Sequence, residues 1–281
     1  MVTADNIADC RAAVAAARRG GRTIGFVPTM GALHEGHLSL LEVARAQADY
    51  VVMSVFVNPL QFGPGEDYER YPRDLPADGS LANSRGVDLV FAPHAEEMYP
   101  GEANVTVKAG RIAGDWEGRI RPGHFDGVLT VVAKLCNIVQ PDVAVFGQKD
   151  LQQARLVEAM IRDLNLPVEL VLAPTIRDAD GLALSSRNRY LQPDERERAL
   201  ALPRALREIH AAWSRGERDV ASLERVGRAT LAAAHGIKID YLAVVERDTF
   251  RRPATLTTHA AAIGAIRVGA TRLIDNVLLD G

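Results

Sequence analysis

The feature that most constrains the fold is an alternation of short apolar runs with longer helical patterns over the first 175 residues. Tyr50–Val57 is almost uniformly apolar and rich in β-branched residues, which is typical of a parallel strand buried on both faces, and Val87–Phe91 repeats the pattern. Further strands are predicted at 23–27, 143–146 and 168–172, and helices at 5–19, from 36 onward, at 128–139 and at 151–164. This alternation predicts an α/β fold with a Rossmann-like, doubly wound parallel sheet.

The character of the sequence changes after about residue 175. A polar loop is followed by two long charged helical patterns between 193 and 234, and then by strand-like stretches near 237–245, 262–268 and 271–279. We therefore expect two domains: a Rossmann-like domain at 1–175 and a smaller C-terminal α+β domain at 176–281.

Composition and charge narrow the class of protein. The chain is 47% hydrophobic and 25% charged, as globular proteins are, and its formal charge of −3 argues against binding nucleic acid mainly by phosphate neutralisation. Cys10 and Cys136 are too few for a disulfide framework, and no C-x-x-C spacing suggests zinc. No apolar stretch approaches the roughly 20 residues of a membrane span. We expect a cytoplasmic protein without nucleic-acid or membrane partners.

The most informative segment is Pro28–His37, between the first predicted strand and the next helix. Ligands of open α/β sheets bind beyond the carboxyl ends of the strands, where this loop would lie. Gly31 and Gly36 would let the backbone approach a phosphate at the helix N-terminus. His34 and His37 share one face of the first turn and could donate to phosphate oxygens. Alternatively, one histidine caps the helix while the other packs; the spacing of three does not fit the H-E-x-x-H zinc motif.

Three further groups of polar residues have a physical interpretation of their own. Lys149 follows a predicted buried strand, where its ammonium can neutralise a phosphate, or it is a solvated surface lysine. Ser185–Arg187 combines hydroxyls with a guanidinium and suits a phosphate-binding lid, or it is an ordinary serine-rich turn. The neutral amides of Asn58, Gln61 and Gln153 can bind hydroxyls and a carboxylate, although most glutamines are merely exposed.

The H-x-G-H pattern resembles the signature of the nucleotidylyltransferase superfamily, and later segments narrow the resemblance to the pantothenate synthetases, or pantoate–β-alanine ligases. The segments that carry it are Val57–Gly63, Tyr71–Arg73, Arg121–Phe125, Phe146–Gln153 and Leu184–Asn188. The resemblance implies ATP-dependent condensation of pantoate with β-alanine through a pantoyl adenylate, with release of pyrophosphate and AMP. It also implies Mg²⁺, a C-terminal lid and a homodimer built through the larger domain.

The resemblance also assigns roles to single residues of this sequence. The implied catalytic residues are His34, His37 and Lys149. The implied pantoate-binding residues, of which Gln61 also lies near β-alanine, are Asn58, Gln61 and Gln153. The implied ATP-binding residues are Met30, Gly31, Ala32, Leu33, His34, Glu35, Gly36, His37, Gly147, Gln148, Lys149, Asp150, Ile176, Leu184, Ser185, Ser186 and Arg187.

The chain departs from the family pattern at three places. Asp78 aligns with an acidic position implied to hold magnesium, but its neighbour is Ala77, so this acidic stretch is thinner than usual. Leu184 stands where the family usually has methionine, and Gln148 stands where it usually has glutamate. Both substitutions should be tolerated if these positions contact adenine or phosphate mainly through backbone or apolar surface.

Two other functions stay open at the level of sequence. Another H-x-G-H adenylyltransferase, acting on a different acceptor, would release a stable nucleotidylated product. A nucleotide-sensing or RNA-binding module would keep the fold without the chemistry. The absence of a large positive surplus argues against RNA, and the retention of both histidines, Lys149 and the Ser-Ser-Arg loop argues against lost chemistry.

Overall fold

The computed structural model describes residues 1–257 and 259–280. The chain divides into two compact units. Unit 1 comprises Met1–Gly147 and Leu156–Pro174, and unit 2 comprises Gln148–Arg155 together with the described chain from Thr175 onward. The short segment Gln148–Arg155 therefore belongs to unit 2, although unit 1 residues flank it in the sequence.

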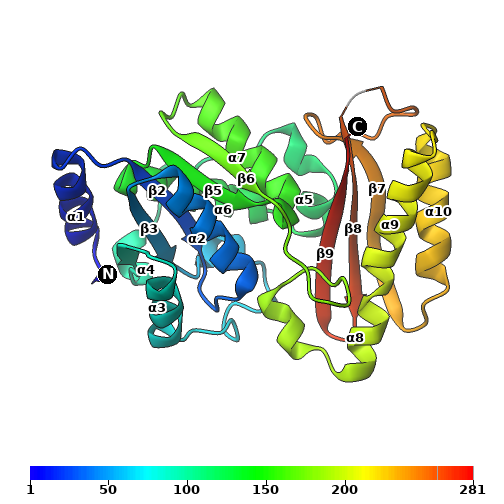
Figure 1. Cartoon of the computed structure of the whole chain (residues 1–281), viewed down its shortest axis with the longest axis horizontal. Helices are drawn as coiled ribbons and strands as arrows, with labels where there is room; N and C mark the ends of the chain where they lie inside the picture. The colour runs from blue at the N-terminus through cyan, green and yellow to red at the C-terminus, as the bar shows by residue number, and fades with distance from the viewer. Residues whose placement is uncertain (258, 281) are drawn as a thin grey trace. The chain divides into compact units, whose positions relative to one another are not determined.

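Unit 1 is built on a parallel sheet which, among the described residues, has six strands in the order β1-β4-β3-β2-β5-β6 (Figure 1). The strands are β1 (Val2–Ala4), β2 (Ile24–Thr29), β3 (Tyr50–Val55), β4 (Leu89–Phe91), β5 (Val143–Gly147) and β6 (Glu169–Ala173). In the central strands β2 and β3, Phe26 and Met53 are fully buried, as expected for a parallel sheet covered on both faces. The predicted α/β fold with a parallel sheet is confirmed.

The helices of unit 1 follow the predicted alternation, with additions. They are α1 (Ile7–Arg19), α2 (Glu35–Gln47), α3 (Leu75–Ser84), α4 (Ala95–Met98), α5 (Glu117–Ile120), α6 (His124–Val139) and α7 (Leu151–Asp163), with the short 3₁₀ helices η1 (Pro59–Gln61) and η2 (Arg111–Gly114). Helix α7 begins in unit 2 and ends in unit 1. In α2, Leu38, Leu41 and Ala44 are buried on one face, which is the helical spacing seen in the sequence.

Several elements differ from the sequence-based prediction. Strand β1 was not predicted, because three residues carry no periodicity and its strand form depends on pairing with β4, which lies far along the chain. Helices α3, α4 and α5 were also not predicted; α3 has a weak apolar face, with few residues facing the core. Strand β3 ends at Val55, two residues earlier than expected.

Unit 2 combines an antiparallel sheet with helices. Among its described residues the strand order is β7-β8-β9, formed by β7 (Ile237–Glu246), β8 (Ala260–Val268) and β9 (Thr271–Leu279). The two helical patterns predicted at 193–234 form three helices: α8 (Pro193–Ala199), α9 (Ala201–Ser214) and α10 (Val220–Ala232). The 3₁₀ helices η3 (Gln148–Asp150) and η4 (Ser186–Tyr190) complete the unit. The predicted α+β character is confirmed.

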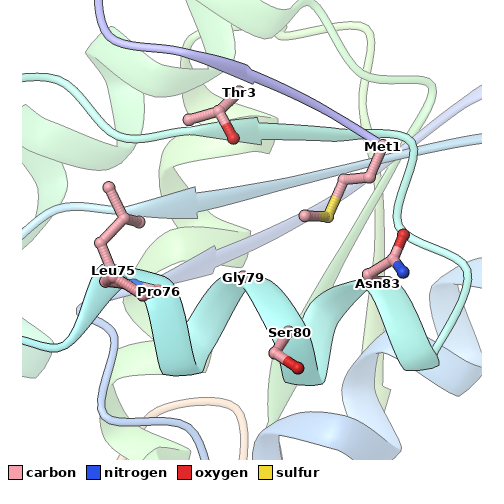
Figure 2. A pocket seen from close by; sticks show the side chains of 7 residues that line it. All are labelled: Met1, Thr3, Leu75, Pro76, Gly79, Ser80 and Asn83. Atoms are coloured by element: carbon pink, nitrogen blue, oxygen red, sulfur yellow. The ribbon is translucent and has the colours of Figure 1, made fainter.

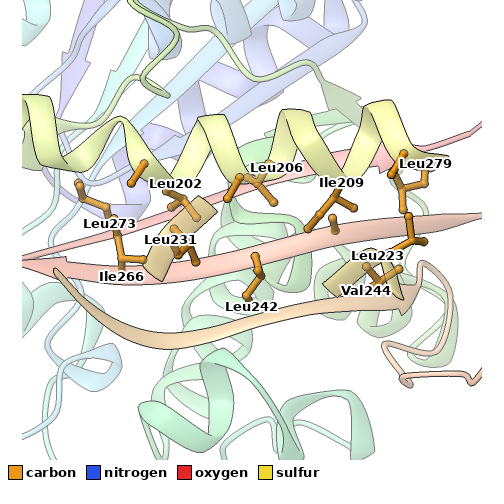
Figure 3. Packing of buried hydrophobic residues seen from close by; sticks show 14 of the residues in the cluster. Leu202, Leu206, Ile209, Leu223, Leu231, Leu242, Val244, Ile266, Leu273 and Leu279 are labelled. Atoms are coloured by element: carbon orange, nitrogen blue, oxygen red, sulfur yellow. The ribbon is translucent and has the colours of Figure 1, made fainter. Parts of the chain in front are cut away.

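The apolar core of unit 2 lies between helices α9 and α10 and its sheet (Figure 3). Leu206 and Ile209 of α9 and Leu223 of α10 are 1% exposed or less, and they meet Leu242 of β7 and Ile266 of β8. A separate buried cluster, containing Val27, Leu41 and Met53 among others, forms the core of unit 1. Among the described residues, no helix has the length and apolarity that a membrane crossing needs.

Candidate active site

The N-terminus of α2 brings His34 and His37 together in unit 1. The two ring centroids are 4.1 Å apart, and the ring planes are inclined by 41°. His34 is also the N-cap of α2, since its Nδ1 accepts a hydrogen bond from the backbone N–H of Gly36 at 3.1 Å. The sequence predicted that His34 and His37 share one face of the helix, and the adjacent rings agree with this. It also offered the alternative that one histidine caps the helix, and His34 does so.

The capping bond fixes the chemistry of the His34 ring. A nitrogen that accepts a hydrogen bond carries no proton, so the neutral ring of His34 has its proton on Nε2. That nitrogen is consequently a hydrogen-bond donor. A donor in a half-buried position at the carboxyl end of a parallel strand suits a phosphate oxygen.

The backbone just before the histidines is held in an uncommon conformation by Asp78 of α3. Gly31 and Ala32 have φ values of +80° and +52°. The Asp78 carboxylate, 3% exposed, accepts the backbone N–H of Ala32 at 3.0 Å and that of Leu33 at 2.8 Å. A Cβ at Gly31 would lie 2.7 Å from Asp78 Oδ2 and 2.9 Å from Val55 Cγ1. In the structure Gly31 permits a close approach to Asp78; the approach of its backbone to a phosphate stays a prediction.

The geometry does not fit the implied role of Asp78 as a magnesium ligand. Its two oxygens each accept a backbone N–H, and its side chain is shielded from solvent. Within the described ranges, no three His, Cys, Asp or Glu side chains gather in a way that could hold a metal ion. In the structure Asp78 is thus committed to backbone hydrogen bonds, and the magnesium site that the resemblance implies stays a prediction.

The amides predicted to bind pantoate occupy different environments. Asn58, 1% exposed, donates from Nδ2 to Gln61 Oε1 and to the carbonyl of Gly127, both at 3.1 Å, and accepts the Tyr99 hydroxyl at 2.8 Å. These bonds place Asn58 as a support for Gln61. The Nε2 of Gln61 donates to the Met30 sulfur at 3.1 Å, and a thioether is a weak acceptor. A ligand oxygen would be a stronger partner for this N–H group.

The segment Arg121–Phe125, one of those that carry the family resemblance, supports the same glutamine. The Gln61 carbonyl accepts from His124 Nδ1 at 2.8 Å and from Arg121 Nη2 at 3.2 Å. Arg121 is held in turn by two bonds to the Glu66 carboxylate, at 2.7 and 2.6 Å. Burial, reinforced by the Arg121 charge, lowers the pKa of His124 to about 4, so this ring is neutral near pH 7. No local sequence signal indicates this role, because Gln61 lies 63 positions away.

In unit 2, the turn η3 carries Lys149 immediately after β5. The Lys149 side chain is 20% exposed, and its Nζ lies 3.9 Å from the carboxylate of the more exposed Asp150. This distance is beyond hydrogen-bond range, so the ammonium is only loosely paired with Asp150. Gln153 follows in the first turn of α7 and is half-buried.

The Ser-Ser-Arg segment of unit 2 directly follows a small hairpin that pairs Ile176 and Arg177 with Leu184 and Ala183. The Leu184 N–H donates to the Ile176 carbonyl at 3.0 Å, beside an isolated bridge between Arg177 and Ala183. Ser185 then caps η4, accepting the Arg187 N–H on its Oγ at 3.3 Å. The hairpin brings together two residues predicted for the ATP site that are eight positions apart in the sequence, Ile176 and Leu184.

A separate pocket of unit 1 contains none of the predicted site residues (Figure 2). It has a volume of about 470 Å³ and lies between β1 and one side of α3. Its lining residues are Met1, Thr3, Leu75, Pro76, Gly79, Ser80 and Asn83. No charged side chain lines the pocket and it contains none of the predicted site residues, so we assign it no part in the site.

Comparison with known proteins reveals similarity along the whole chain. A family model described as pantoate-beta-alanine ligase matches residues 2–278. The pantothenate synthetase of Moorella thermoacetica is 52% identical over 280 residues, which cover 100% of this chain and 99% of that protein. The pantothenate synthetase of Acidothermus cellulolyticus is 54% identical over 280 residues, covering 98% and 91% respectively.

Solved structures give the same result at the level of the fold. The crystal structure of pantothenate synthetase from Thermus thermophilus has a TM-score of 0.95 and 49% identity, with 100% of both chains covered. That of pantoate-beta-alanine ligase from Francisella tularensis, complexed with beta-gamma ATP and beta-alanine, has a TM-score of 0.81 and 34% identity, covering 100% of this chain and 98% of that one.

Proposed function

Since this chain belongs to the pantoate–β-alanine ligase family and is therefore a ligase, we propose that it condenses pantoate with β-alanine by way of an ATP-derived pantoyl adenylate. The family match over residues 2–278 supports the substrates. The observation that carries the chemistry is the His34–His37 pair, in which the α2 cap fixes the Nε2–H of His34 as a donor. A different H-x-G-H adenylyltransferase is not favoured by these comparisons.

The proposed reaction has two steps without a covalent enzyme intermediate. A carboxylate oxygen of pantoate attacks the α-phosphorus of ATP in line, and the bond to the bridging oxygen of pyrophosphate breaks. The amine of β-alanine then attacks the acyl carbon, loses a proton and displaces AMP. Both steps are accelerated by aligning the reactants and by stabilising the charge that develops on phosphoryl oxygens.

Unit 1 would supply the donors and the pantoate contacts. His34 and His37 would donate to the phosphoryl oxygens as their negative charge grows. Gln61 would exchange its weak bond to the Met30 sulfur for a bond to a pantoate oxygen, while Asn58 holds its carbonyl end. Because Gln61 is already oriented before the ligand binds, little side-chain freedom is lost on binding.

Unit 2 would supply positive charge for the leaving pyrophosphate. The Lys149 ammonium is partly removed from water, which strengthens its attraction to phosphate oxygens. The segment Ser185–Arg187 would bind phosphate through hydroxyls and a guanidinium, and Gln153 would bind pantoate. We retain the lid role of this unit as a prediction, because shielding an acyl adenylate from water would prevent its hydrolysis. Mg²⁺ bound with ATP would neutralise triphosphate charge.

The test is pantoate-dependent exchange of labelled pyrophosphate into ATP, with Mg²⁺ present and β-alanine absent. We expect exchange only when pantoate is added, and we expect β-alanine to divert the intermediate to AMP and pantothenate. Folded protein that shows no exchange at any pantoate concentration would overturn the proposal. A stable nucleotidylated product from another acceptor would then identify the rival adenylyltransferase.

The same assay tests the lysine. Lys149→Ala should fold normally and lose on the order of 10²- to 10³-fold in exchange rate, which is typical of removing one preorganised charge stabiliser. Lys238→Ala, which removes an exposed lysine from β7 of the same unit, is the matched control and should leave the rate unchanged. A folded Lys149→Ala variant with wild-type exchange would exclude the lysine from the mechanism.

A further inference from the structure

The side chain of Asn276, in β9, forms hydrogen bonds to the turn that carries Lys149. This side chain is 2% exposed, and its Nδ2 donates to the backbone carbonyl of Gln148 at 2.9 Å and to that of Lys149 at 3.0 Å. Its Oδ1 accepts the Gln148 side-chain amide at 3.1 Å. Both N–H groups and the oxygen of Asn276 are thus engaged, and every one of these bonds leads to Gln148 or Lys149.

The bonds from Asn276 control the direction of the lysine side chain. The 3₁₀ turn η3 has only three residues, so its conformation depends on contacts with the rest of unit 2. The carbonyls of Gln148 and Lys149 flank the Cα of Lys149, and fixing both sets the peptide planes on its two sides. The side chain of Lys149 then leaves the backbone in one defined direction.

The neighbouring residue on the strand anchors the hairpin of the Ser-Ser-Arg segment. Asp275, 4% exposed, accepts two hydrogen bonds from the Arg177 guanidinium, at 2.6 and 2.9 Å. Arg177 lies directly after Ile176 and bridges to Ala183 in the hairpin. Its Nη2 also donates to the Asn276 carbonyl at 3.2 Å. Two consecutive β9 residues therefore bind the turn that carries Lys149 and the hairpin that directly precedes Ser185.

We propose that Asn276 is a positioning residue for the adenylation step, which acts by holding the backbone carbonyls on either side of Lys149. This inference rests on the catalytic role proposed for Lys149. Without the Nδ2 donor the two carbonyls lose their partner, the turn relaxes, and the ammonium is no longer preorganised for the phosphate. Misplacement of a charge by about 1 Å can reduce a rate up to roughly 10²-fold.

The decisive variant is Asn276→Asp, which keeps the size and the Oδ1 acceptor but replaces the donor with an oxygen facing two carbonyls. We expect pantoate-dependent exchange to fall about 10- to 100-fold in kcat, with the KM for pantoate nearly unchanged. Val277→Ala is the matched control, because Val277 is the next residue of β9 and packs against the apolar core of unit 2. It should lower stability without the kcat loss.

A double-mutant cycle separates positioning from general destabilisation. In the Lys149→Ala background, Asn276→Asp should change the exchange rate by less than about twofold, since the group it positions is gone. If the losses of exchange rate in the two single variants multiply in the double variant, Asn276 does not act through Lys149. That result would overturn the positioning role and leave the catalytic role of Lys149 intact. If Lys149→Ala alone has no effect, the proposed role of the lysine fails, and this inference fails with it. Should Asn276→Asp not fold, Asn276→Ala serves in the same cycle with the same expected outcome.

Discussion

The two nitrogens of the His34 ring perform different tasks. Nδ1 caps α2 through the Gly36 N–H, and this bond leaves Nε2 as the donor. The functional and structural interpretations of this histidine are therefore compatible, since the cap is what fixes the tautomer. The same bond also ties the direction of the ring to the start of the helix that carries His37.

Substitution of His34 should separate these tasks. His34→Ala should lower the free energy of unfolding by about 1 kcal/mol through loss of the cap, and should reduce exchange on the order of 10²-fold through loss of the donor. His34→Asn provides a strong N-cap residue and should restore stability but not the rate. The measurements are chemical denaturation and pyrophosphate exchange. Recovery of both by asparagine would show that the imidazole serves only as a cap.

Asp78 holds the loop before the histidines through two buried hydrogen bonds, and we predict that it is not a metal ligand. Asp78→Ala would leave two buried N–H groups, those of Ala32 and Leu33, without their partner, at about 1–3 kcal/mol each. We expect a fall of roughly 2–6 kcal/mol in unfolding free energy and slower exchange. Asp78→Ala should need the same Mg²⁺ concentration for half-maximal exchange as wild type. The matched control is Glu69→Ala, which removes an exposed carboxylate and should also leave this concentration unchanged. A variant of full stability that needs tenfold more Mg²⁺ would instead identify Asp78 as a ligand.

At the scale of elements, helix α6 approaches η1 so closely that only glycine fits between them. A Cβ at Gly127 would lie 2.2 Å from the carbonyl oxygen of Leu60 and 2.7 Å from the backbone nitrogen of Gln61. The obstructing atoms are backbone, so they can move only if η1 moves. Because η1 carries Gln61, the packing of α6 determines where the predicted pantoate amide lies.

Substitution by alanine should therefore change the free energy of unfolding in opposite directions at two helical glycines. Gly127→Ala should destabilise the protein by about 1–3 kcal/mol and raise the KM for pantoate, because η1 is displaced. Gly79→Ala in α3 meets only the Met1 Cε at 3.7 Å, so it should gain about 0.5–1 kcal/mol from reduced chain entropy. Thermal unfolding and saturation kinetics measure both effects. A neutral Gly127→Ala with unchanged KM would show that α6 does not position η1.

The low pKa of His124, at the start of α6, makes stability depend on pH. The folded pKa of about 4 lies below the ordinary value of 6.5, so the unfolded chain binds the proton first as the pH falls. The stabilisation is complete above pH 6.5 and is lost as the pH falls towards 4. Arg121, Glu66 and Glu117 act on the same ring.

His124→Asn should remove this dependence while keeping a donor near the position of Nδ1. Between pH 7.5 and pH 4.5, wild type should lose roughly 2–3 kcal/mol more unfolding free energy than the variant. Urea denaturation at the two pH values provides the comparison, in which carboxylates common to both proteins cancel. Equal losses in the two proteins would contradict a neutral, buried His124.

At the scale of the whole molecule, each unit has its own apolar core. The candidate residues are divided between the units: His34, His37 and Gln61 belong to unit 1, whereas Lys149 and Arg187 belong to unit 2. The assignment of Gln148–Arg155 to unit 2 agrees with the bonds of Asn276, which tie this short segment to β9.

The homodimer and the cytoplasmic location implied by the resemblance and the composition stay predictions. Sedimentation equilibrium should give about twice the 30.4 kDa mass of the chain, with a dimer that persists at assay concentrations. A mass equal to the single chain across the concentration range would contradict the homodimer, without bearing on the chemistry proposed for either unit.

The sequence by itself determined the features that depend on near neighbours. The buried strands β2, β3 and β5 follow from continuous apolar runs, and α2 follows from its spacing and its N-terminal cap, because helical and capping bonds join residues four positions apart or fewer. The proximity of His34 and His37 follows from the same local geometry.

Only the tertiary structure decided the bonds that hold the candidate residues in place. The partners of Asp78 lie 45 and 46 positions away, and those of Asn276 lie 127 and 128 positions away. Strand β1 likewise exists only because β4 pairs with it. A buried polar group must find a hydrogen-bond partner, but chain topology determines which distant residue provides it. Neither local propensity nor periodicity contains that information.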